Sequence, residues 1–199
     1  MSDEARSGDF WVFGYGSLMW RPGFEFVEQR RALLRGWSRR LCIYSHIYRG
    51  TAERPGLVLG LDRGGSCHGV AFRVAAMNWP SALAYLRERE LVTTVYFERR
   101  VRLDFGAYAL TYVADRGHAQ YAGRLERGRL LELVRRSHGR AGANVDYVIN
   151  TQAHLTAIGI HDGELEWLAG QLRGEAANSD SGAKSPIKAA RSPGDSASK

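Results

Sequence analysis

Near its beginning the chain reads Phe10-Trp11-Val12-Phe13-Gly14-Tyr15-Gly16-Ser17-Leu18-Met19-Trp20. The aromatic and β-branched run from Phe10 to Phe13 is typical of a buried strand, and it stops at two closely spaced glycines. Because glycines let bare backbone N–H groups come close together, such a loop can hold a carboxylate or a carbonyl oxygen. The stretch therefore predicts a strand that runs into a binding loop, where an active site would begin.

The loop matches none of the common glycine motifs. No Gly-Lys-Ser/Thr follows it, as a Walker loop requires, and the third glycine of the dinucleotide fingerprint is missing. Ser17 is not framed by the Gly-x-Ser-x-Gly of a serine hydrolase. From these residues alone, a simple strand-ending turn without a ligand remains the alternative.

The composition is that of a globular domain. The chain has 199 residues, of which 44% are hydrophobic and 25% are charged, which is enough to bury one core. No apolar run approaches the roughly 20 residues that span a bilayer. The start of the chain lacks the apolar segment of a secretory signal. We therefore expect no membrane association and a cytoplasmic location.

The cysteines and histidines predict no metal site. Cys42 and Cys67 lie in apolar or alternating stretches, which indicates buried free thiols in a reducing compartment. The six histidines show no spacing typical of metal ligands, and Cys-x₂-Cys is absent. We expect neither a metal nor a cofactor.

The net charge of +7 raises the question of a nucleic-acid partner. All lysines fall within residues 184–199, and upstream of them the arginines are scattered among acidic residues. No basic helix with interleaved aromatics is present. A small-molecule ligand is therefore the preferred partner, nucleic-acid binding is the alternative from another class, and the oligomeric state stays open.

The order of patterns predicts an α+β fold. We expect a flexible leader at 1–9, one domain at 10–173 and a disordered tail at 174–199, where small and polar residues replace aromatics. Within the domain, one mixed sheet or small barrel should be surrounded by helices. The predicted strands are 10–13, 32–34, 41–45, 57–61, 67–74, 92–102 and 108–113, with a hairpin turn at 62–66; the predicted helices start near 78, 125, 144 and 162.

Helix ends and carboxylates add detail to this prediction. Asn78 is expected to cap the first helix, and Gly139 to stop the second. Glu90 falls where the first helix ends and an apolar segment begins. Partial burial there would raise its pKa and suit it to work as a general base near neutrality. A solvated, salt-bridged helix face is the alternative for this carboxylate.

Taken in order, several motifs of the chain resemble the ChaC-type γ-glutamylcyclotransferases. The resemblance runs from about Phe10 to Leu172, and the ordered series is more specific than any single piece. It rests on Phe13-Gly14-Tyr15-Gly16-Ser17-Leu18 with Trp20, Tyr48-Arg49-Gly50-Thr51, Pro55-Gly56 with Leu57 to Leu61, Gly65-Ser66-Cys67-His68-Gly69-Val70-Ala71, Tyr85-Leu86-Arg87-Glu88-Arg89-Glu90, Tyr121-Ala122-Gly123 and Asn144-x-x-Tyr147.

The resemblance implies a barrel-like mixed sheet and an enzyme that needs no metal or cofactor. It implies cleavage of glutathione, or of a related γ-glutamyl peptide, into 5-oxoproline and cysteinylglycine. The family's catalytic carboxylate falls on Glu90. Its substrate loop falls on Phe13, Gly14, Tyr15, Gly16, Ser17 and Leu18.

The chain departs from the family pattern at three places. The Gly-Gly-Tyr that often follows the catalytic Glu is replaced by Leu91-Val92-Thr93, Tyr48 stands where His is usual, and Ala141 stands where Ser is common. We expect these positions around the pocket or its rim, where they affect the leaving portion of the substrate more than the reaction. A cyclotransferase for another γ-glutamyl amine and a non-catalytic γ-glutamyl-binding protein are the further alternatives.

Overall fold

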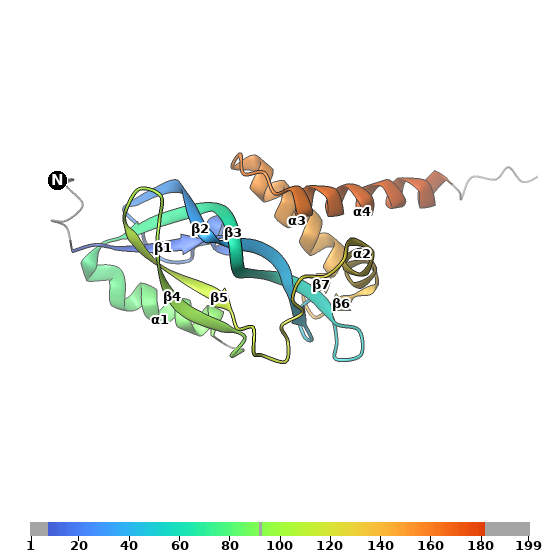
Figure 1. Cartoon of the computed structure of the whole chain (residues 1–199), viewed down its shortest axis with the longest axis horizontal. Coiled ribbons are helices and arrows are strands. Elements are labelled where there is room, and N and C mark those ends of the chain that lie inside the picture. Colours follow the sequence, from blue (N-terminus) through green and yellow to red (C-terminus); the bar gives the residue numbers. More distant parts are fainter. Residues whose placement is uncertain (1–7, 92, 182–199) are drawn as a thin grey trace, which may run out of the picture.

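A five-stranded mixed sheet forms the centre of the molecule. The computed structural model describes residues 8–91 and 93–181. The strands lie in the order β2-β3-β1-β5-β4; β1 runs parallel to β5, and the other neighbours are antiparallel. The predicted α+β architecture is confirmed (Figure 1). The strands are β1 Phe10–Gly14, β2 Glu28–Ser45, β3 Gly56–Val74, β4 Tyr96–Arg102 and β5 Tyr108–Ala114, with a small pair formed by β6 His138–Gly139 and β7 Gly142–Ala143.

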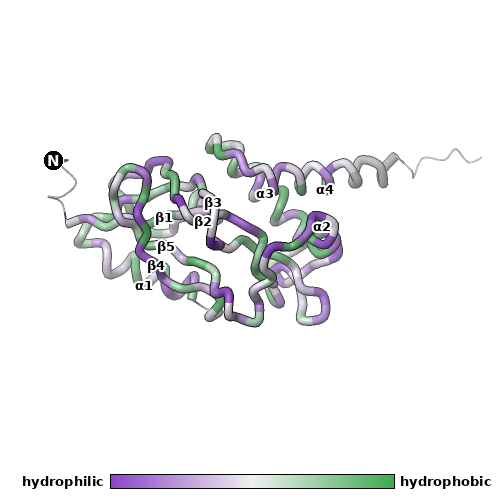
Figure 2. Tube along the Cα trace, in the orientation of Figure 1, coloured by the Kyte–Doolittle hydropathy of each residue, from purple (hydrophilic) through white to green (hydrophobic). Residues whose placement is uncertain are grey.

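In the described part of the chain, four α-helices pack around this sheet. The first covers one side of it, and the other three form a group at the opposite end of the molecule (Figure 1). Hydrophobic and hydrophilic residues are interspersed along these helices rather than gathered in blocks (Figure 2), and no helix in the described ranges has the length and apolarity to cross a membrane. The helices are α1 Trp79–Glu90, α2 Arg127–Arg136, α3 Asn144–Ala157 and α4 Gly163–Ser181.

The predicted hairpin turn at Asp62–Ser66 is wrong. β3 runs through this segment without a break and pairs along its length with β2, which is likewise one long strand rather than two short ones. Gly64 and Gly65 have positive φ angles of 96° and 72°, and the register shifts opposite them, between Arg35 and Trp37. The glycines therefore form a bulge that bends a long two-stranded ribbon, where the sequence predicted a reversal of the chain.

Two helix-end predictions also need correction. The side chain of Asn78 makes no capping hydrogen bond at α1; its amide donates instead to Glu25 Oε2 at 2.9 Å. Gly139 does not stop α2, because α2 ends before Ser137 and Gly139 pairs in the small sheet with Gly142. Asn78 thus has a partner remote in sequence in place of the expected cap, and Gly139 belongs to a short β-hairpin in place of a helix end.

The two edges of the sheet approach each other. Leu34 of β2 forms an isolated bridge with Leu103, just after β4. The backbone N–H of Asp104 donates to Leu33 O at 3.1 Å, and its carboxylate accepts from Leu33 N at 3.0 Å. The sheet is therefore curled into a half-barrel, which brings residues from distant strands around one interior.

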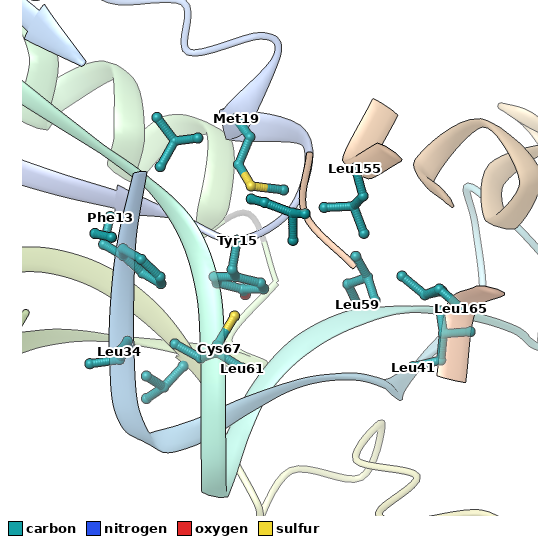
Figure 3. Close-up of a cluster of buried hydrophobic side chains, with 14 of the residues drawn as sticks. Phe13, Tyr15, Met19, Leu34, Leu41, Leu59, Leu61, Cys67, Leu155 and Leu165 are labelled. Carbon is teal, nitrogen blue, oxygen red and sulfur yellow. The ribbon is translucent and has the colours of Figure 1, made fainter. Parts of the chain in front are cut away.

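The short first strand is buried on both faces. Trp11 and Phe13 belong to the large core between the sheet and the C-terminal helices, whereas Val12 belongs to a second cluster beneath α1. Figure 3 shows Phe13 and Tyr15 among aliphatic side chains of this large core. A strand buried on both faces explains why the run beginning at Phe10 does not alternate with polar residues.

Both predicted limits of the domain, at residues 9/10 and 173/174, fall within the described residues. Asp9 is described and its carboxylate pairs with Arg73, 2.6 Å away, while residues 1–7 of the predicted leader lie outside the described residues. The segment predicted as a tail begins within α4, which continues to Ser181. Its remainder, 182–199, also lies outside the described residues.

Candidate active site

Glu90 is the last residue of α1 and lies against the sheet. The helix closes with a hydrogen bond from Leu91 N to Arg87 O at 3.0 Å, after which the chain turns toward β4. The Glu90 side chain is only 19% exposed. Burial raises the pKa of its carboxyl group, and the neighbouring Arg89 guanidinium offsets part of that rise. The predicted partial desolvation of this carboxylate is confirmed.

Arg89 connects Glu90 to the glycine loop. Its Nε lies 3.1 Å from Glu90 Oε1, and its Nη2 donates to Ser17 Oγ at 2.8 Å. Its Nη1 donates to Arg21 O at 2.6 Å and to Tyr85 Oη at 3.0 Å. One guanidinium thus holds the end of α1, the loop after β1 and the carboxylate in a fixed relation.

The glycine loop is shaped by close approaches of backbone. A Cβ on Gly69 of β3 would lie within 2.3 Å of Gly14 O, so the two strands can meet here only with a glycine. A Cβ on Gly16 would meet nothing nearer than Leu59 Cδ1, at 3.7 Å. Gly16 therefore has open space beside it, although Gly14, two residues earlier, is tightly packed against Leu18.

The loop and Glu90 line one cavity of about 280 Å³. Of the predicted loop residues, Tyr15 to Leu18 line this cavity, whereas Phe13 points into the core and Gly14 ends β1. Tertiary structure therefore brings together two segments that are remote in the sequence. The lining consists of Tyr15, Gly16, Ser17, Leu18, Tyr48, Val58, Leu59, Arg89, Glu90, Tyr96, Tyr112 and Tyr147.

The tyrosines of this cavity hold the adjoining strand β3. Tyr96 Oη donates to Leu59 O at 2.8 Å, and Tyr147 Oη accepts from Leu59 N at 3.2 Å. The pKa of Tyr15, Tyr96 and Tyr147 is raised, chiefly by burial, so their hydroxyls stay neutral at physiological pH. The negative charge of Glu90 adds to the rise in the pKa of all three tyrosines, so they lie close to its carboxylate.

Asn144 explains the first half of the Asn-x-x-Tyr motif. Its buried side chain accepts from Leu57 N at 2.6 Å and donates to Leu57 O at 2.8 Å. The N-terminus of α3 is thus joined to the same stretch of β3 that Tyr147 holds one turn later. Asn144 and Tyr147 therefore position the β3 wall of the cavity, and these hydrogen bonds give them a structural role.

The buried Arg39 side chain holds the loop on the side away from the cavity. Arg39 Nε donates to Tyr15 O at 2.5 Å, and its Nη2 donates to His68 O at 2.6 Å. Its Nη1 pairs with Asp162 Oδ2 at 3.0 Å, and Asp162 also accepts from Leu165 N in the first turn of α4. Arg39 therefore links the loop, the sheet and the start of α4.

Reasoning from the sequence did not single out Arg39, Arg89 or Tyr96. The only local signal was for Arg89, which precedes Glu90 at the helix end. Tyr147, the last residue of the Asn-x-x-Tyr motif, is partly buried and lines the cavity.

The departures from the family pattern cluster beside the cavity, as expected. Tyr48 is 53% exposed and lines the cavity, and Ala141 N donates to Tyr48 O at 2.9 Å. Thr93, the last residue of the segment that follows Glu90 in place of Gly-Gly-Tyr, lines an adjoining hollow.

Comparison with known families gives an extended match. The model of the family described as ChaC-like protein matches residues 10–174. A glutathione-specific gamma-glutamylcyclotransferase of Escherichia coli strain K12 is 33% identical over 159 residues, which cover 78% of this chain and 69% of that protein. Glutathione-specific gamma-glutamylcyclotransferase 1 of Homo sapiens is 34% identical over 147 residues, covering 70% of this chain and 66% of the relative. The chain therefore spans about two thirds of the length of these relatives.

Solved structures share the fold. A yeast gamma-glutamyl cyclotransferase specific to glutathione superposes with a TM-score of 0.74 at 19% sequence identity, covering 83% of this chain and 96% of the yeast chain. A second crystal structure described in the same terms gives a TM-score of 0.69 at 21% identity. At this identity the likeness concerns the architecture, and the half-barrel with its surrounding helices is the shared part.

Proposed function

The chain belongs to the ChaC-like family, and from that premise we propose that it is a γ-glutamylcyclotransferase that converts glutathione into 5-oxoproline and cysteinylglycine. The observation that carries the proposal is the cavity where Glu90, with its raised pKa, faces the loop Tyr15–Leu18. An enzyme of this class needs a carboxylate that can accept and return a proton, beside a surface that orients a γ-glutamyl group.

The reaction is an intramolecular aminolysis in which Glu90 moves one proton twice. The carboxylate takes a proton from the substrate's α-ammonium group, and the free amine then attacks the γ-carbonyl carbon. The resulting carboxylic acid returns the proton to the amide nitrogen as the carbon–nitrogen bond breaks, and the ring nitrogen gives up its second proton to the departing amine. A neutral five-membered lactam and a protonated amine leave. The raised pKa of Glu90 suits both transfers, because the group must be a base first and an acid second.

The loop serves to fold the substrate into a reactive geometry. Nucleophile and electrophile are parts of one molecule, so much of the catalysis is positioning. In the proposal, the backbone N–H groups of Tyr15, Gly16 and Ser17 face the glutamyl carboxylate or the oxyanion that develops on the γ-carbonyl. The open space beside Gly16 supports this role, since a ligand can approach the backbone there.

Arg89 holds the two parts of the site in register. Its contacts with Ser17 and Glu90 make it a bridge between loop and carboxylate. Its positive charge also offsets part of the rise that burial causes in the pKa of Glu90. The two buried, unpaired cysteines agree with the cytoplasmic location that belongs to this proposal.

Incubation with glutathione, scored by release of 5-oxoproline, tests the proposal. We expect turnover by the wild type and a loss of roughly 10²-fold or more in Glu90→Gln, which keeps the shape of the side chain but cannot accept the proton. Glu88→Gln, on the same helix and outside the cavity lining, is the matched control. Near-wild-type turnover by Glu90→Gln would remove Glu90 from the mechanism, and no turnover by the wild type of any γ-glutamyl compound would favour a binding protein.

A further inference from the structure

A second cavity, of about 230 Å³, adjoins the first across Glu90. The two cavities share five lining residues, so they are two compartments of one hollow with the carboxylate between them. The second is lined by Ile43, Tyr44, Ser45, His46, Ile47, Tyr48, Val58, Arg89, Glu90, Thr93, Val95, Tyr96 and Gln120. The shared residues are Tyr48, Val58, Arg89, Glu90 and Tyr96.

The lining of the second compartment is mostly apolar and nearly free of charge. Among its described residues, the charged side chains are Glu90 and Arg89, which pair with each other. Apolar groups form its inner wall, where Ile43 and Val95 are buried. His46 and Ile47 are exposed and mark its open side. A ligand here meets apolar contacts inside and an imidazole at the mouth.

The position of Glu90 indicates which part of the substrate each compartment would bind. In the proposed reaction this carboxylate works on both sides of the scissile amide, first at the α-amine and then at the departing nitrogen. A group that lies between two hollows can do so when the glutamyl part fills the first and the leaving part extends into the second. The loop Tyr15–Leu18 lines only the first compartment, and the segment Ile43–Ile47 lines only the second.

We infer that the second compartment is the binding site for the leaving amine, and that it takes a short peptide or amino acid with a small uncharged side chain. This inference rests on the proposed function. No described residue of the lining is dedicated to recognising a thiol. The nearby Cys42 is not a lining residue, because its Sγ is buried near Gly60, where its pKa is raised to about 12. The site therefore selects the size and neutrality of the side chain, and a methyl group replaces the thiol without loss.

The two reaction products probe the two compartments separately. We expect Thr93→Phe, which fills the second compartment from its half-buried rim, to weaken inhibition by cysteinylglycine about tenfold or more while inhibition by 5-oxoproline stays at the wild-type level. Thr94→Phe is the matched control, because Thr94 is exposed and outside the lining. Ile47→Trp, at an exposed position that cannot disturb the core, should repeat the effect of Thr93→Phe.

A substrate comparison completes the test. The wild type should release 5-oxoproline from γ-glutamyl-2-aminobutyryl-glycine at a kcat/KM within about threefold of that for glutathione, and much more slowly from γ-glutamyl-lysine. If the wild type is active on glutathione, but both blocking variants change inhibition by the two products equally or not at all, the assignment of the compartment is wrong. A wild type inactive on glutathione overturns the proposed function instead.

Discussion

Arg39 Nε donates a hydrogen bond of 2.5 Å to the carbonyl oxygen of Tyr15, so a buried guanidinium holds the first residue of the glycine loop that lines the cavity. The same side chain reaches His68 O and Asp162. Loop geometry thus depends on a cation that contacts a lining residue from outside the cavity and does not itself line it. A residue of this kind acts on substrate binding through the loop.

Replacing Arg39 should separate loop positioning from general stability. Arg39→Lys keeps the charge near Asp162 but loses the planar fork that reaches Tyr15 O, so we expect KM for glutathione to rise about fivefold or more with a smaller change in kcat. Asp162→Asn keeps the bond to Tyr15 and loses the ion pair, so it should lower the melting temperature with KM near the wild type. Steady-state kinetics and thermal unfolding of both variants decide; equal KM values in the two would contradict a positioning role.

The raised pKa of Glu90 makes stability depend on pH in a defined direction. Because the folded protein holds this proton more tightly than the unfolded chain, wild type loses stability relative to Glu90→Gln as pH rises from the ordinary glutamate value through the raised one. Below that window the contribution of Glu90 to stability is fully present. Urea unfolding of both proteins between about pH 4 and pH 8 measures the difference. A difference that is constant, or that favours the wild type as pH rises, would contradict the burial of this carboxylate.

Gly16 should tolerate a side chain in the folded protein but not in the complex. Gly16→Ala meets no atom nearer than 3.7 Å, so we expect a nearly unchanged melting temperature, and Gly16→Val should weaken a γ-glutamyl analogue about tenfold, near 1.4 kcal/mol. Gly69→Ala is the contrasting variant, because its Cβ meets Gly14 O; overpacking there should cost about 1–3 kcal/mol of stability. Calorimetric binding with wild-type affinity in Gly16→Val would remove the loop from substrate recognition.

Both cysteines should be inert in the folded protein. Burial raises the pKa of Cys42 to about 12 and that of Cys67 to about 11, so at neutral pH the thiolate fraction is on the order of one part in a thousand or less. Ellman's reagent should label neither thiol in native protein and both after unfolding in guanidinium. Rapid labelling of the native protein would show that one thiol is accessible and would reopen a role for it.

The sequence was sufficient for the parts of this protein that depend on local pattern. The run Phe10–Phe13 determined a buried strand, the change at Asn78 determined a helix, and the glycines after Phe13 indicated a loop. The partial burial of Glu90 was predictable, because a carboxylate at a helix end beside apolar residues has a local signature. Its catalytic role stays a prediction. The ordered motifs were enough to predict the family and the α+β fold, both of which the comparisons and the structure bear out.

Tertiary structure decided everything that depends on pairing between distant segments. Gly64 and Gly65 have the local chemistry of a turn, but continuous pairing with β2 makes them a bulge. The bend they give the ribbon helps to curl the sheet, and the curled sheet sets the loop after β1 opposite the end of α1. Arg39 and Arg89 gained their roles from partners remote in sequence, since a side-chain hydrogen bond depends on where the folded chain puts its acceptor. Glu90 and the Tyr15–Leu18 loop therefore lie at one cavity because the half-barrel packs them there. The local conformational preferences of either segment do not determine where the other one lies.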